Sequence, residues 1–210
     1  FVVFVVASVV AQERSDRIVS IVPALTEALF AVGAGAQVVG VGTFDTTPPE
    51  VASRPRVGGL LDPDLERIFA LRPDLVVLYG SQTDQRSQLV RAGIDVFPYA
   101  HGGLTETLAT LRDLAVRVGR SRAGDTLVRN LESRLTMLRK QTAGRPRPRV
   151  LLVFGREPGS LRNIYASGGI GFLHDLLEAA GGRNVFANVA RESVQLTSEA
   201  ILAAAPEVIL

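Results

Sequence analysis

Residues 121–142 constrain the fold of this chain more than any other stretch. Apolar residues recur there at steps of three or four, the spacing of one face of an α-helix. These apolar residues are Leu127, Val128, Leu131, Leu135 and Leu138. Gly144 and the prolines at 146 and 148 end the pattern. A helix of this length spans roughly 33 Å, about the width of a small domain. Because strand–helix patterns lie on both sides, we interpret residues 120–144 as a rigid helix that bridges two lobes.

Short apolar runs alternate with helical patterns on both sides of this segment. The strands predicted for the first lobe, residues 17–119, are 17–22, 37–41, 74–79 and 95–99, and its helices are 26–33, 64–71, 82–92 and 104–118. In the second lobe, residues 148–210, we expect strands at 149–154, 184–186 and 207–210, and helices at 172–180 and 197–204. Such alternation is typical of parallel sheets with crossover helices. The sequence therefore predicts an α/β fold of two Rossmann-like lobes.

The two ends of the sequence suggest a longer protein. Residues 1–11 are apolar except for Ser8, and eleven residues are too few to span a bilayer. Val9 and Ala11 fit the −3 and −1 positions of a signal-peptidase site, so we expect the remnant of a signal peptide and an exported, periplasmic or extracytoplasmic protein. A buried first strand is the alternative. The final strand ends the sequence, and we expect the second lobe to be truncated.

Composition excludes several classes of protein. The chain has no Cys and two His, so thiolate metal sites, disulfides and a Cys nucleophile are excluded, and neither a lipidated N-terminal Cys nor a zinc or manganese site is expected. A net charge of +2 without a basic block gives no reason to expect nucleic-acid binding. The SGGIGF run at 167–172 fits neither a P-loop nor a complete dinucleotide fingerprint, and no G-x-S-x-G motif occurs. We therefore expect no catalytic residues and no enzyme, with a nucleotide-binding α/β enzyme as a remote alternative.

A repeated unit occurs once on each side of the long helix. Residues 64–78 and 197–210 each begin with a capping residue, carry a glutamate two positions later, and continue to a proline and an apolar strand. The glutamates are Glu66 and Glu199. Both lie in the first turn of a predicted helix, where a carboxylate favours the helix dipole. The alternative is that the two lobes present matching acidic residues to a partner with two-fold symmetry.

Candidate ligand-binding residues follow the predicted strands. In open α/β sheets, ligands bind beyond the carboxyl ends of the strands. The residues selected by this rule are Leu25, Phe44, Leu60, Tyr79, His101, Arg156 and Tyr165. Aromatic and apolar faces with a few polar groups suit a flat macrocycle or chelate. His101 could coordinate a ligand's metal or simply face solvent, and Arg156 could pair with a ligand carboxylate or lie free in a loop.

Three segments, residues 17–50, 56–78 and 171–186, resemble the helical-backbone (class III) periplasmic substrate-binding proteins of ABC importers. The cobalamin (vitamin B12) binding branch is the most similar. The resemblance implies a monomer of two α/β lobes joined by one rigid helix, with the ligand between the lobes. It also implies that Glu66 and Glu199 dock onto arginines of a dimeric permease.

The resemblance also bears on the ligand. Phe44, Tyr79 and Tyr165 match positions where the cobalamin branch contacts its ligand. That branch often uses Trp, which this chain lacks, and Leu60 stands where a bulky aromatic is expected. A transported corrinoid is therefore the first expectation, and haem or a ferric siderophore is the alternative. No resident cofactor or metal is expected.

Overall fold

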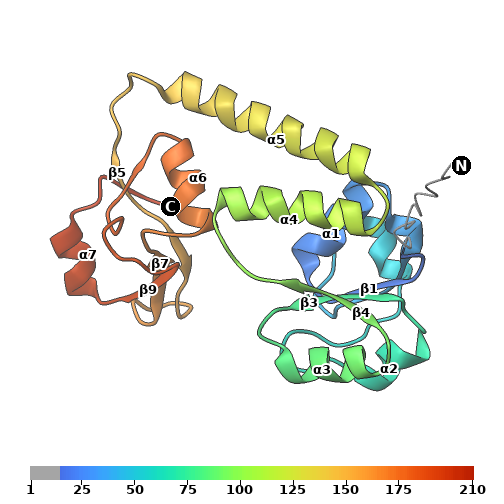
Figure 1. Ribbon diagram of the computed structural model, residues 1–210. Coiled ribbons are helices and arrows are strands. Elements are labelled where there is room, and N and C mark those ends of the chain that lie inside the picture. Colours follow the sequence, from blue (N-terminus) through green and yellow to red (C-terminus); the bar gives the residue numbers. More distant parts are fainter. Residues whose placement is uncertain (1–14) are drawn as a thin grey trace, which may run out of the picture.

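The computed structural model describes residues 15–210, and the expected signal-peptide remnant lies outside this range. Figure 1 shows two α/β lobes side by side, with the long helix α5 (Ser121–Thr142) running along both of them. The bounds of α5 are those expected from its apolar spacing. Among the described residues, no helix is both long and apolar enough to cross a membrane. The predicted α/β fold of two lobes and a bridging helix is confirmed.

The first lobe is built on a four-stranded parallel sheet. Its strands are β1 (Ile18–Ser20), β2 (Val38–Val41), β3 (Leu75–Tyr79) and β4 (Asp95–Tyr99), in the order β2-β1-β3-β4. Its helices are α1 (Pro23–Ala31), α2 (Leu65–Ala70), α3 (Thr83–Arg91) and α4 (Leu104–Arg117), with 3₁₀ turns η1 (Gly35–Gln37) and η2 (Pro49–Ser53). Parallel strands all end at the same edge of a sheet, so the loops after them form one surface.

Both faces of this sheet are buried, which explains the continuous apolar strands. Leu75 and Val77 of β3 pack on one side with α1 and α4, while Val76 and Leu78 pack on the other side with Ile68 of α2. Figure 1 accordingly shows α2 and α3 on the face of the sheet away from α5. Two local expectations differ: α1 begins at Pro23 because proline suits the first helical position, and the prolines near residue 49 form a short 3₁₀ turn instead of an irregular loop.

The second lobe contains two small sheets. β5 (Arg149–Leu151), β8 (Arg183–Asn184) and β10 (Val208–Ile209) form a parallel sheet in the order β10-β5-β8. β6 (Val153–Gly155), β7 (Ile164–Ser167) and β9 (Ser193–Leu196) form an antiparallel sheet in the order β6-β7-β9. The helices are α6 (Phe172–Ala179) and α7 (Ser198–Ala204). The sequence predicted one strand over 149–154, which is instead divided at Leu152 between the two sheets, and it did not predict the antiparallel pairing.

The bridging helix α5 is packed against both lobes. Near its start, Gly124 lies so close to Ala115 of α4 that a Cβ built on this glycine would be 2.3 Å from the Ala115 Cβ. Arg112 of α4 donates to Glu132 of α5 at 2.8 Å. At the other end, the Thr142 side chain lies against Gly181, which follows α6. These contacts fix α5 along its length, and the domain boundaries at 17–119, 120–144 and 148–210 remain our prediction.

Candidate ligand-binding site

Three rings gather where β3 and β4 end. Tyr79 and Tyr99 are register partners in the parallel ladder, and their ring centroids are 6.0 Å apart. The His101 ring lies 5.9 Å from that of Tyr79 and 5.0 Å from that of Tyr99. The Tyr99 hydroxyl is 3.4 Å from His101 Nδ1. We call Tyr79, Tyr99 and His101 the aromatic cluster; it places three aromatic faces at the edge of the sheet where the parallel strands end.

The two phenols of the aromatic cluster are partly shielded from water. Burial raises the pKa of Tyr79 and of Tyr99, and the neighbouring phenol adds to the shift at Tyr79. Both hydroxyls are therefore neutral near pH 7 and can donate hydrogen bonds. The cluster can thus offer a ligand both flat apolar surface and hydroxyl donors.

A cavity of about 450 Å³ lies between the two lobes. The first lobe contributes Tyr99, His101 and Thr107 to its lining. The second lobe contributes side chains from β6 and from the segment around the start of α6. These include Phe154, Ile170 and Phe172, and Glu192 joins the lining from the residue directly before β9 (Ser193–Leu196). Phe154, Ile170 and Phe172 are all substantially exposed, as expected for side chains that border an open cleft and not a core.

A second hollow of about 670 Å³ adjoins the same sheet edge in the first lobe. Phe44, Leu60 and Tyr79 line it together, as the strand-end rule predicted. The Phe44 side chain is 74% exposed and lies against Gly59. Buried Gln82 holds this region in place: its side chain accepts from Tyr79 N–H at 3.0 Å and donates to the Leu60 carbonyl at 3.0 Å.

A buried carboxyl lies beneath this hollow. Asp45 is 1% exposed, and within the described residues no donor reaches its carboxyl oxygens with full hydrogen-bond geometry, although the Thr26 hydroxyl and the Gly42 N–H lie close to them. Burial raises the pKa of Asp45 and outweighs the Thr26 hydroxyl, the Gly42 N–H and the Arg56 guanidinium, all of which lower it. Arg56 donates to the backbone carbonyls of Gly42 and Asp45, at 2.9 and 2.6 Å, and so fixes the loop that carries Phe44.

The remaining sequence candidates lie elsewhere. The Leu25 side chain is 3% exposed and packs in the core of the first lobe. Arg156 donates to the Ser160 carbonyl at 3.3 Å and borders an apolar hollow of the second lobe that is distinct from the inter-lobe cavity. Tyr165 lies on β7, is 39% exposed and packs beside Gly155. The structure therefore brings Phe44, Leu60, Tyr79 and His101 to one edge, and leaves Leu25, Arg156 and Tyr165 outside the two hollows.

Several lining residues were not among the sequence candidates. Tyr99 ends the strand predicted at 95–99, so the strand-end rule also selects it, although it is not one of the seven candidates given above. Ile170 lies in the glycine-rich run before α6, and Phe172 is the first residue of that helix; an apolar side chain next to glycine was the only indication for either. Nothing in the sequence marked Gln82, because its role depends on the spatial approach of Leu60.

The repeated glutamates have matching surroundings. Glu66 and Glu199 are both exposed, each in the first turn of its helix, α2 or α7. The capping residue before each glutamate accepts from the third residue after it in the chain: Asp64 from Arg67 N–H at 3.0 Å, and Thr197 from Ala200 N–H at 3.2 Å. The pKa of Glu199 is lowered by hydrogen bonds to its carboxylate from the Glu199 backbone N–H and from the Thr197 hydroxyl. The repeat is thus a structural one, presented once on each lobe.

The described residues contain no group of three or more His, Asp or Glu placed to hold a metal ion. A cleft between two α/β lobes, lined by aromatic and apolar side chains and spanned behind by one helix, defines a two-lobe solute-binding protein. Residues 18–210 match the Periplasmic binding protein family, and the chain belongs to that family.

Individual relatives agree with this assignment. The vitamin B12-binding protein of Salmonella paratyphi A is 33% identical over 198 residues, which make up 93% of this chain and 72% of the relative. BtuF, the periplasmic vitamin B12 binding protein of Vibrio cholerae, has the same fold, with a TM-score of 0.78 and 24% identity over 93% of this chain and 75% of that one. The periplasmic heme-binding protein RhuT from Roseiflexus sp. RS-1 matches as well, with a TM-score of 0.80 and 28% identity over 93% of this chain and 75% of that one. The fold therefore does not distinguish these two ligand classes.

Proposed function

We propose that this chain is the solute-binding component of an ABC importer and that it captures a corrinoid, such as cobalamin, between its lobes. The aromatic cluster at the ends of β3 and β4 carries the proposal. Across the inter-lobe cavity, Phe154 and Phe172 supply apolar surface from the second lobe. Two walls of this kind suit a flat ring system bound by its faces. The 33% identity to a curated vitamin B12-binding protein favours the corrinoid.

Haem is the second candidate, and His101 is the observation that favours it. The imidazole is exposed at the cavity, and the Tyr99 hydroxyl engages Nδ1, which leaves Nε2 facing away from that bond. A neutral imidazole nitrogen is a common iron ligand. The same nitrogen could coordinate the cobalt of a corrinoid, so His101 alone does not separate the two ligands.

Titration distinguishes the candidates. The purified protein is mixed with cobalamin, haem and a ferric siderophore in turn, and binding is followed by visible absorbance and by tyrosine fluorescence, which is free of Trp background. We expect saturable binding of cobalamin at lower concentration than the other two. Preferential binding of haem, with a spectral change lost in His101→Ala, would replace the corrinoid proposal by the haem proposal. Binding of none of the three would contradict both.

The proposed partner is a dimeric permease. Glu66 and Glu199 are exposed, and each lies in the first turn of a helix with a matching cap. These helices, α2 and α7, belong to different lobes (Figure 1). Carboxylates in these positions can pair with arginines on two related subunits. We propose that the protein is exported, acts as a monomer, and delivers its ligand without chemical change.

A further inference from the structure

The N-terminus of α4 is capped by a residue of the other lobe. The N-cap residue is Gly103, which has no side chain to accept a hydrogen bond from the first turn. Glu106, in the same lobe, accepts from Gly103 N–H at 2.9 Å. The next N–H, that of Leu104, donates to Asp175 Oδ2 of α6 at 2.7 Å. One free N–H is thus satisfied locally and the next across the gap between the lobes.

Glycine at position 103 is required by this approach and not by backbone conformation. The backbone of Gly103 is extended, with φ −79° and ψ −170°, which any residue adopts. A Cβ built on it would lie 2.4 Å from Asp175 Oδ2. The absence of a side chain lets the carboxylate reach the start of a 14-residue helix, where the aligned peptide dipoles favour a negative charge. We call this contact between Asp175 and residues 103–104 the inter-lobe clasp.

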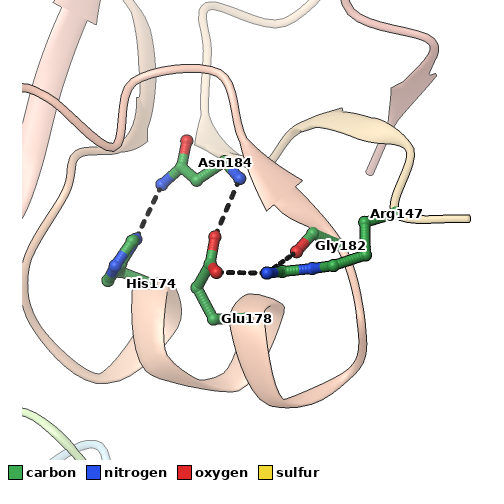
Figure 2. A network of polar contacts seen from close by, with 5 residues as sticks. All are labelled: Arg147, His174, Glu178, Gly182 and Asn184. Atoms are coloured by element: carbon green, nitrogen blue, oxygen red, sulfur yellow. Dashed lines mark hydrogen bonds and ion pairs between the residues drawn. The ribbon is translucent and has the colours of Figure 1, made fainter. Parts of the chain in front are cut away.

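The helix that carries Asp175, α6, is tied to its own lobe by a polar network around the buried Asn184 side chain. Figure 2 shows Asn184 between His174 and Glu178 of α6. The Asn184 side chain donates to the Gly168 carbonyl at 2.7 Å and lies 3.3 Å from His174 Nδ1, and its backbone N–H donates to Glu178 at 3.1 Å. Arg147 pairs with the other oxygen of Glu178. Because α6 is tied to the sheets of the second lobe, a bond from Asp175 to α4 holds one lobe to the other.

The clasp lies beside the inter-lobe cavity. Gly102 and Thr107, on either side of the clasped residues, line that cavity, and so do Gly171 and Phe172 just before Asp175. Behind the clasp, Leu104 and Phe172 also border an apolar crease of about 610 Å³ between α4, α5 and α6. Space on both sides means that packing alone does not fix the lobes here. The clasp is therefore a direct polar link between the lobes, next to the His101 loop and at the border of the cavity.

We propose that Asp175 is a positioning residue which holds the lobes at their binding separation and keeps the His101–Gly103 loop in place. The effect on lobe separation is independent of the ligand, whereas the effect on affinity rests on the proposed function. A hydrogen bond to a charged group contributes enough that its loss shifts the balance between clasped and unclasped lobes by roughly tenfold or more.

The test compares two carboxylates that cap the same helix end. Asp175→Ala removes the bond between lobes, and Glu106→Ala removes the bond within one lobe. The chain has no cysteine, so spin labels at Gln88→Cys in α3 and Ala203→Cys in α7 report the lobe separation by pulsed electron resonance. In the ligand-free protein we expect a longer and broader distance distribution for Asp175→Ala only. Unchanged distances, or equal changes in both variants, would show that Asp175 does no more than cap α4, and would overturn the proposal.

Two further variants guard against simple loss of stability. Asp175→Asn keeps an acceptor oxygen and the side-chain shape but loses the charge, and we expect it to lie between wild type and Asp175→Ala. Gly103→Ala alone should lengthen the distance between the spin labels. Combined with Asp175→Ala it should add little, because the two changes break the same contact. Additive effects of the two substitutions on this distance would contradict the proposed contact. For a ligand that the wild type binds, we expect affinity to fall about tenfold in Asp175→Ala and to be retained in Glu106→Ala. If no tested ligand binds, the distances still decide the proposal.

Discussion

Tyr79 and Tyr99 are direct neighbours across β3 and β4, with their ring centroids 6.0 Å apart at the edge of the sheet that opens toward the second lobe. Their side chains lie together because parallel register places the last residue of each strand at one level. The pair is therefore a property of strand pairing and not of a flexible loop, which makes it a rigid surface for a ligand.

Replacing either tyrosine by leucine should weaken ligand binding. An aromatic contact contributes about 1 kcal/mol beyond its buried area, so we expect roughly a fivefold loss of affinity for Tyr79→Leu and for Tyr99→Leu in a titration. Tyr99→Phe keeps the ring and should lose less. Phe69→Leu, on α2 and outside both hollows, serves as the matched control. Equal affinities for all four variants would exclude the aromatic cluster from the binding site.

The paired glutamates should matter for transport and not for capture. We expect the double variant Glu66→Ala, Glu199→Ala to bind ligand with unchanged affinity and to bind the permease at least about tenfold more weakly, since charge pairs at interfaces often contribute that much. Glu50→Ala, another exposed acidic residue in the first turn of a helical segment, is the control. Permease binding and uptake are the measurements, and wild-type uptake by the double variant would refute the docking role.

Breaking α5 should damage binding and docking together. Leu131 lies near the middle of the helix and lines the crease between α4, α5 and α6. Proline there removes a backbone hydrogen bond and costs about 3 kcal/mol. We expect Leu131→Pro to lower both ligand affinity and permease affinity, whereas Leu131→Ala, which preserves the helix, should affect both much less. A loss confined to one of the two activities would show that α5 does not set both spacings.

Asp45 should make stability depend on pH. Its pKa in the folded protein is raised above the ordinary value of 3.8, so the folded state binds a proton more tightly than the unfolded state does. Ionising the buried carboxyl lowers the free energy of unfolding. This loss is absent below pH 3.8, grows as pH rises toward the pKa of the folded state, and stays constant above that pKa. Asp45→Asn should therefore raise the melting temperature near pH 7, with little change near pH 3.5. Melting curves of both proteins across this range are the measurement, and a gain that is largest in acid would contradict the assignment.

How far the sequence predicted the structure depends on whether each feature is local. The bridging helix was predicted over the same residues, 121–142, because its apolar spacing lies within one element. The buried strand β3 was found for the same reason. The antiparallel sheet β6-β7-β9 was missed, since β9 has the sequence SVQL and its identity as a strand depends on pairing with β7 far away in the chain.

The site follows the same distinction. The strand-end rule predicted that Phe44, Leu60, Tyr79 and His101 lie at one edge of the sheet, because that placement depends only on topology; their role in binding stays a prediction. It could not show that Leu25 turns into the core, or that β5 and β6 separate at Leu152 and carry Arg156 to another hollow. The inter-lobe clasp was out of reach, because it joins residues 71 positions apart through one hydrogen bond.

Within residues 15–210 the chain passes from one lobe to the other once, through α5, so every strand of the first sheet precedes this helix and every strand of the other two follows it. A single genetic exchange within the α5 coding region would therefore replace one half of the binding surface and leave every sheet whole. Recombination between relatives can in this way produce new ligand preferences without new folds. In such chimaeras, Gly103 and Asp175 would come from different parents, so the hydrogen bond between the lobes would depend on both of them.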